Sequence, residues 1–171
     1  MIDGKAKQFD DGLYAAIDLA YYQGLGKTLT SHVDFVKRLQ AKVGARSPAS
    51  PFLAAGLELA GVKVEIADIS AKEEFLSKFR GDQVRSKPIG FYTWDPRLEK
   101  LFVFLRFFQD KLSKPVAESL AAALRADEGL KADYAKLIGF FSKLTNPRAR
   151  ASLLDLVNDP ETNKPIWFLP P

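Results

Sequence analysis

Apolar residues recur three and four positions apart along most of this chain, the spacing that gathers them on one face of an α-helix. Between these stretches stand residues that begin or end helices, chiefly Ser, Thr, Asp and Pro before them and Gly after them. Together the two signals predict seven or eight helices. The expected ranges are about 11–23, 31–44, 50–60, 70–81, 95–110, from 115, 127–144 and 146–157, and 62–66 is a candidate short strand.

The segment after Asp95 and Pro96, LEKLFVFLRFF, carries apolar side chains on almost every side of its predicted helix. A helix that is apolar all round is buried, so we expect this one at the centre of the fold. No abrupt change of composition and no Gly/Ser linker divides the chain. The sequence therefore predicts a mainly α fold: a single compact multi-helix domain over residues 1–171 around this central apolar helix, with at most a small two-stranded β element.

Residues 158–171 are expected to form an extended C-terminal tail. In 165–169, as in 88–94, both alternating faces are largely apolar, which is typical of extended chain that is buried on both sides. The prolines of the two segments suit edge positions, where a missing N–H is tolerated. We therefore expect the tail to fold back across the helices and to lie near residues 87–94.

Composition excludes several classes of protein. Hydrophobic residues make up 47% of the chain and charged residues 27%, which are globular values and not those of a disordered or collagen-like chain. The absence of Cys and the single His exclude disulfide scaffolds, thiolate nucleophiles, iron–sulfur clusters and Cys-rich zinc sites. No cofactor and no metal are therefore expected.

The charge is mildly basic, at +4, and leaves the partners open. Nucleic acid is an unlikely partner, because no stacking aromatic residues interleave with the basic ones around 27–46 and 143–150. The longest uncharged stretch, 47–57, is too short to cross a membrane. We expect a soluble monomer and, since the apolar ending PIWFLPP is unusual for a free terminus, a fragment of a longer protein. Its compartment is open, and would be the cytoplasm if the chain is complete.

Two motifs attract attention and are set aside. GLGKT, over 24–28, ends like a phosphate-binding loop, but Tyr21 stands where that loop needs its leading glycine, and a predicted helix precedes it instead of a strand. His32 has no second histidine with which to share a metal, so we expect it at the surface or in the capping region of a helix.

Arg106 is the most informative position, because an arginine on so apolar a helix needs a partner. At 100° per residue Glu99, Arg106 and Asp110 fall within about 40° on the helix surface. We expect a structural ion pair of Arg106 with Asp110, one turn on, or with Glu58, the one charge in the apolar segment PFLAAGLELAG. The alternative is a cleft in which Arg106 grips a substrate carboxylate or phosphate while Glu58, Glu99 or Asp110 transfers a proton.

Tyr92 and Trp94 mark a candidate surface for a ligand or partner, since they combine stacking area with hydrogen-bond donors just before a helix. The function that we expect is a non-catalytic helical module of a larger protein, which binds a protein or peptide partner or another domain of the same parent chain. The alternative is an enzyme domain whose carboxylate and arginine cleft acts on an anionic small molecule. The enzyme hypothesis requires Arg106 and at least one of the three carboxylates on the wall of one accessible pocket.

Overall fold

The computed structural model describes residues 2–26, 30–144 and 149–170. Within these ranges the chain is mainly α-helical, with one short 3-10 helix and one two-stranded parallel sheet. The elements in chain order are α1 (Ile2–Gln23), α2 (His32–Val43), α3 (Ser50–Leu59), α4 (Ile69–Gly81), α5 (Gln83–Ser86), η1 (Gly90–Thr93), α6 (Pro96–Phe108), α7 (Lys114–Arg125), α8 (Glu128–Leu144), β1 (Ala151–Ser152), α9 (Leu153–Asn158) and β2 (Ile166–Trp167). The predicted fold class is confirmed.

The helix ends follow the capping chemistry of the sequence, with some corrections. Asp95 accepts a hydrogen bond from the Arg97 N–H at the start of α6, as predicted. At α4 the capping side chain is Asp68, which accepts from Ala71, and not the predicted Ser70. The last helix begins at Leu153 behind a Ser152–Asp155 capping box. Its predicted start at 146 lies outside the described residues.

Three segments differ from the expected elements. The candidate strand 62–66 is irregular chain, because among the described residues no strand lies beside it to complete a ladder. The short helices α5 and η1 occupy a stretch for which no helix was predicted. Helix α1 begins at Ile2, well before the predicted start at Asp11, since residues 2–10 hold helix-forming Lys, Ala and Gln and no proline.

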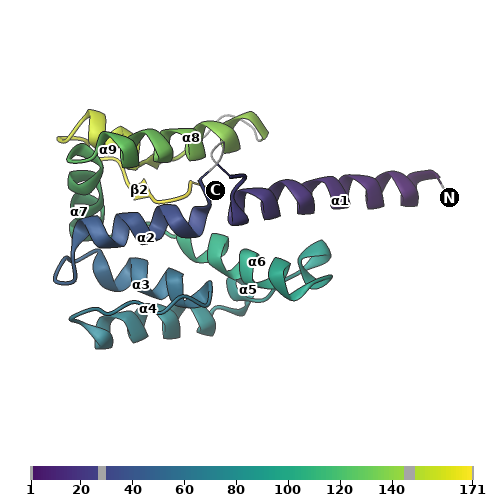
Figure 1. Ribbon diagram of the computed structural model, residues 1–171, viewed down its shortest axis with the longest axis horizontal. Helices are drawn as coiled ribbons and strands as arrows, with labels where there is room; N and C mark the ends of the chain where they lie inside the picture. The colour runs from purple at the N-terminus through teal and green to yellow at the C-terminus, as the bar shows by residue number, and fades with distance from the viewer. Residues whose placement is uncertain (1, 27–29, 145–148, 171) are drawn as a thin grey trace.

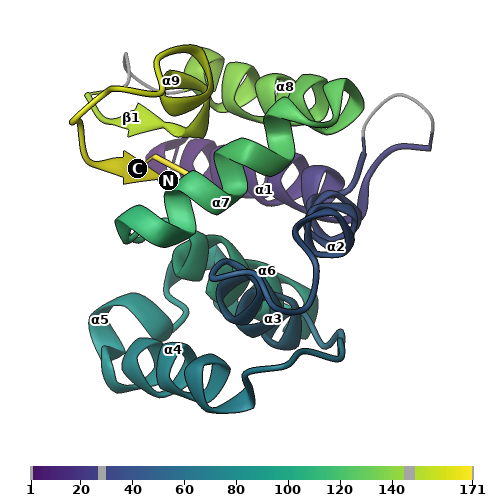
Figure 2. The ribbon, with the colours of Figure 1, turned by 90° about the vertical axis from the view of Figure 1, so that its left-hand side faces the viewer.

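The helices form stacked layers with α1 along one side (Figure 1). Helices α8 and α9 lie above, α3 and α4 lie below, and α2, α6 and the C-terminal strand β2 lie between them. Helix α7 connects the upper and lower parts, as the view turned by 90° shows (Figure 2). The N-terminal half of α1 extends beyond the rest of the molecule.

The centre of the core is aromatic and includes the C-terminal tail. Phe168 is 1% exposed and packs on Phe108 of α6, with ring centroids 4.7 Å apart. Phe52 of α3 and Tyr134 of α8 pack on Phe168 from other sides, at 6.0 and 5.8 Å. The Tyr134 hydroxyl also donates to the Phe168 carbonyl at 2.6 Å. Residue 168 is therefore a shared contact of the upper and lower layers.

The tail folds back as predicted, but it lies against other segments than expected. Strand β2 pairs in parallel with β1, and the backbone N–H of Leu112 donates to the Ile166 carbonyl at 2.9 Å. The Leu169 N–H donates to the Phe108 carbonyl at 3.0 Å. The prediction that the tail lies near 87–94 is thus wrong, because the free backbone groups just after α6 and before α9 take its hydrogen bonds.

Candidate functional site

A groove of about 530 Å³ lies where α5, η1 and α6 meet, and it contains two of the predicted site residues. We name it the Arg106 groove. Its principal lining side chains are those of Val84, Ile89, Tyr92, Phe102, Leu105 and Arg106. Gln109 also lines the groove, so its polar groups are the Arg106 guanidinium, the Gln109 amide and the Tyr92 hydroxyl. The rest of the surface is mainly hydrophobic, with one cationic group.

Local geometry places these side chains around the groove. Gly90 has a φ of 60°, a left-handed conformation that glycine adopts without strain, and it turns the chain from the exposed Ile89 into η1. The next element, α6, starts at Pro96. Phe102 and Arg106 are four residues apart on α6, so both lie on the same face of the helix and line the groove. The walls thus come from both sides of one tight turn.

Arg106 makes no ion pair with any described residue, so the predicted pair with Asp110 or Glu58 is wrong. Its Nη1 donates to Oε1 of Gln109 at 2.9 Å. Helix α6 ends at Phe108, so Asp110 no longer follows the helical rotation that would bring it under Arg106. Asp110 instead pairs with Arg85 at 3.0 Å.

The three predicted carboxylates lie away from the groove. Glu58 lies 2.6 Å from the Lys72 ammonium and 3.5 Å from the Arg80 guanidinium. The hydrogen bond from Lys72 is the main reason that the pKa of Glu58 lies below its ordinary value. Glu99 is exposed on α6, and neither it nor Asp110 lines the groove. The condition set for the enzyme hypothesis is therefore not met in this groove.

Tyr92 turns its hydroxyl into the protein. The hydroxyl donates to Oδ2 of Asp18 at 2.6 Å, and the ring packs on Phe102 with centroids 5.0 Å apart. Burial raises the pKa of Asp18, and burial together with Asp18 raises the pKa of Tyr92, which stays protonated at neutral pH. Asp18 was not among the predicted site residues, although a lone acid between Ile17 and Leu19 is a weak signal of a half-buried carboxylate.

Trp94 is 56% exposed beside the groove. Its ring meets Phe91 edge-on at 6.1 Å, and it does not line the cavity itself. Ile89 and Val84, on the other wall, are 67% and 88% exposed. Exposed apolar side chains therefore continue the groove outward over the neighbouring surface.

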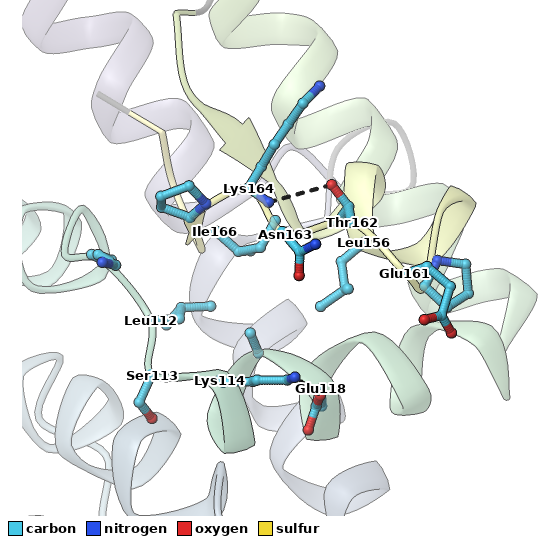
Figure 3. A pocket seen from close by; sticks show the side chains of 14 residues that line it. Leu112, Ser113, Lys114, Glu118, Leu156, Glu161, Thr162, Asn163, Lys164 and Ile166 are labelled. Atoms are coloured by element: carbon cyan, nitrogen blue, oxygen red, sulfur yellow. Dashed lines mark hydrogen bonds and ion pairs between the residues drawn. The ribbon is translucent and has the colours of Figure 1, made fainter.

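A second pocket, of about 440 Å³, lies between the start of α7 and the tail (Figure 3). Lys114 extends along α7 towards Glu118, 3.7 Å away, while Lys164 points away from both. The Lys164 backbone N–H donates to Thr162 at 3.5 Å. The basic side chains do not converge on one point, so this pocket does not present an anion site.

His32 is the first residue of α2, next to the N-cap Ser31, so it lies in the capping region, which was one of the two expectations, but it is buried and not at the surface. It is 4% exposed, and its ring lies 5.5 Å from that of Tyr21. Burial lowers its pKa to about 3, so the imidazole is neutral at physiological pH. Gly24, with a φ of 81°, ends α1 as predicted, while 27 and 28 of the GLGKT motif lie outside the described residues.

The described residues contain no group of three His, Asp or Glu side chains placed to hold a metal ion, and no helix long and apolar enough to cross a membrane. The Arg106 groove offers one cation, a half-buried phenol and apolar walls. Groups of this kind can bind and orient a ligand. No protein family, no curated protein and no solved structure matches this chain.

Proposed function

We propose that this chain is a non-catalytic protein-binding module whose Arg106 groove takes a short apolar peptide segment carrying one carboxylate. The segment belongs to another protein or to another domain of the parent chain. The observation that carries the proposal is an arginine without a carboxylate partner among the described residues, set in an apolar groove whose rim side chains Ile89 and Val84 are mostly exposed.

The chemistry of the groove favours a peptide over a small anionic substrate. Val84, Ile89 and Trp94 offer apolar area that a small anion cannot cover. A guanidinium bordered by apolar side chains forms strong, charge-assisted hydrogen bonds with a carboxylate, because little water competes there. A peptide with an apolar anchor and an Asp, Glu or terminal carboxylate satisfies both parts of the groove.

A random peptide library displayed on phage and selected against the folded chain tests this proposal. We expect the enriched peptides to share apolar residues and an acidic group. Labelled copies of these peptides should bind the chain in fluorescence polarisation, and about 10- to 100-fold more weakly to Arg106→Gln, since a hydrogen bond to a charged group contributes about 1.5–3 kcal/mol. Ile89→Ser should weaken binding similarly.

Matched controls exist on the same chain. Arg97 lies on the same helix as Arg106 but pairs with Asp95 at 2.9 Å, and Ile69 is 63% exposed at the start of α4. Arg97→Gln and Ile69→Ser should leave peptide binding unchanged. The proposal fails if no peptide is enriched, or if the enriched peptides bind the groove variants as tightly as the unaltered chain.

A further inference from the structure

The projecting half of α1 carries an apolar stripe that nothing in the described structure covers. Residues 4–10 are all exposed, and Phe9 and Leu13 are 70% and 49% exposed. Ala6, Phe9, Leu13 and Ala16 follow the alternating three- and four-residue spacing of a coiled-coil heptad. In that heptad Ala6 and Leu13 are a positions, while Phe9 and Ala16 are d positions.

The stripe faces away from the rest of the protein. Ala15 is buried, and Leu19 and Tyr22 pack against the core from the opposite side of α1. Ala16, one residue from Ala15, is exposed. A second helix can therefore lie along the stripe without displacing any contact that holds α1 to α2, α6 and η1.

A free-standing half helix of this composition has little stability of its own. Gly4 and Gly12 each cost about 1 kcal/mol relative to Ala in a helix interior. Isolated helices of this length are marginal in water, and most helices in proteins owe their stability to a packed apolar face. A second helix packed on the stripe would supply the stabilisation that this half of α1 lacks.

From these observations we infer that two copies of this chain associate through α1 as a short, parallel, in-register coiled coil. The charges beside the seam indicate the partner and its direction. Lys5 is a g position and Asp10 is the following e position, the pair that lies across a parallel, in-register seam. Neither side chain has an ion pair within the described part of the chain. Two such pairs form in the dimer by symmetry.

The same charges disfavour other occupants. In an antiparallel pair the e positions face each other, so Asp10 would meet an acidic or apolar residue and gain no ion pair. A lipid surface is disfavoured too, because residues 2–14 contain two lysines and three aspartates and so have no positive charge to attract anionic headgroups. The expectation of a monomer, drawn from the sequence, is replaced by this inference.

Sedimentation equilibrium of the full chain, over a concentration series from low micromolar upward, tests the inference. We expect a reversible monomer–dimer equilibrium that Phe9→Ser with Leu13→Ser weakens about a hundredfold or more. Both side chains are exposed, so these variants should keep the cooperative unfolding of the core. The projecting half of α1, deprived of its partner helix, should lose part of its helical circular dichroism. Tyr14→Ser, a change at a 50% exposed b position on the outside of the predicted coiled coil, should leave the dimer nearly unchanged.

Charge exchange and cross-linking test the geometry. Lys5→Glu should weaken the dimer severalfold to about tenfold, and adding Asp10→Lys should restore it, since exposed ion pairs contribute a few tenths of a kcal/mol each. The chain has no Cys, so Ala6→Cys gives a clean probe that should form a disulfide with its own copy on mild oxidation. Gln8→Cys, on the outside of the predicted seam, should cross-link poorly.

Three results would overturn the inference. A chain that stays monomeric throughout the concentration series does not form this dimer. If that monomer also binds lipid vesicles, and the binding requires Phe9 and Leu13, the apolar stripe is a lipid-binding surface. A dimer that is insensitive to the Phe9 and Leu13 changes lies elsewhere on the molecule. A dimer in which Ala6→Cys does not link to itself is not parallel and in register.

Discussion

Gly56→Ala should destabilise this protein more than any ordinary Gly-to-Ala change in a helix. Gly56 lies in α3 where it crosses α6, and a Cβ at this position would stand 2.2 Å from Cζ and 2.4 Å from Cε2 of Phe108. Carbon atoms in contact lie about 3.5–4.0 Å apart, so the ring would have to retreat by at least about 1 Å.

The Phe108 ring has no room to retreat. It is fully buried, and its neighbours Phe52, Phe104 and Phe168 have ring centroids between 4.7 and 5.2 Å away. Overpacking of this kind costs about 1–3 kcal/mol, and here we expect the upper end or beyond. The higher helix propensity of Ala relative to Gly offsets up to about 1 kcal/mol of this cost. We therefore expect a net loss of about 2–3 kcal/mol, or about 4–12 °C in the thermal midpoint for a chain of this size.

Urea unfolding followed by circular dichroism measures this loss, with Gly139→Ala as the matched control. Gly139 lies in α8 and is exposed, and a Cβ at this position would meet no neighbouring side chain or element within 4 Å. Ala there should therefore stabilise the protein by up to about 1 kcal/mol. A cycle with Phe108→Leu should show at least about 1 kcal/mol of coupling, because the smaller side chain makes room for the methyl group. If Gly56→Ala is as stable as Gly139→Ala, the reasoning about the helix crossing is refuted.

Three further predictions concern the tail, a buried base and the groove. Phe168→Ala should cost about 3–5 kcal/mol in urea unfolding, and an unchanged midpoint would contradict its place in the core. The pKa of His32 is about 3 when folded and 6.5 when unfolded, so the unfolded state takes up the proton first and stability should fall as the pH drops from 6.5 towards 3. A pH series with His32→Leu should lack this part of the fall. Arg106→Gln should change the free energy of unfolding, measured by thermal melts, by less than about 1 kcal/mol. A larger loss would show that Arg106 stabilises the fold and would contradict its assignment to the groove.

Local signals in the sequence were enough to place most helices. Asp95 and Pro96 mark the start of α6, and Gly44 with a φ of 78° ends α2, because caps and stops depend on residues within one turn. Burial of the central helix also followed from its composition alone, since seven of its side chains are buried.

The contacts that the sequence did not predict depend on distant segments. The predicted position of Asp110 assumed a helical rotation that stops at Phe108. Its partner Arg85 comes from α5, a four-residue helix capped by Asp82 that was not predicted from the sequence. The tail was expected beside 87–94 on apolar pattern alone, whereas its position depends on backbone hydrogen bonds to residues 108, 112 and 151–152. Asp18 was missed because its partner Tyr92 is 74 residues away in the chain.

Phe168 also constrains the order in which this protein can fold during synthesis. Its contacts reach back to Phe35 and Phe52, so the contact order at the centre of the core is high. The ribosome makes the chain from the N-terminus at about 5–20 residues per second, and until residue 168 is released the apolar faces of α2, α3 and α6 lack the ring that joins them. A nascent chain that ends before residue 165 should therefore bury less of these three apolar faces than the chain that includes Phe168.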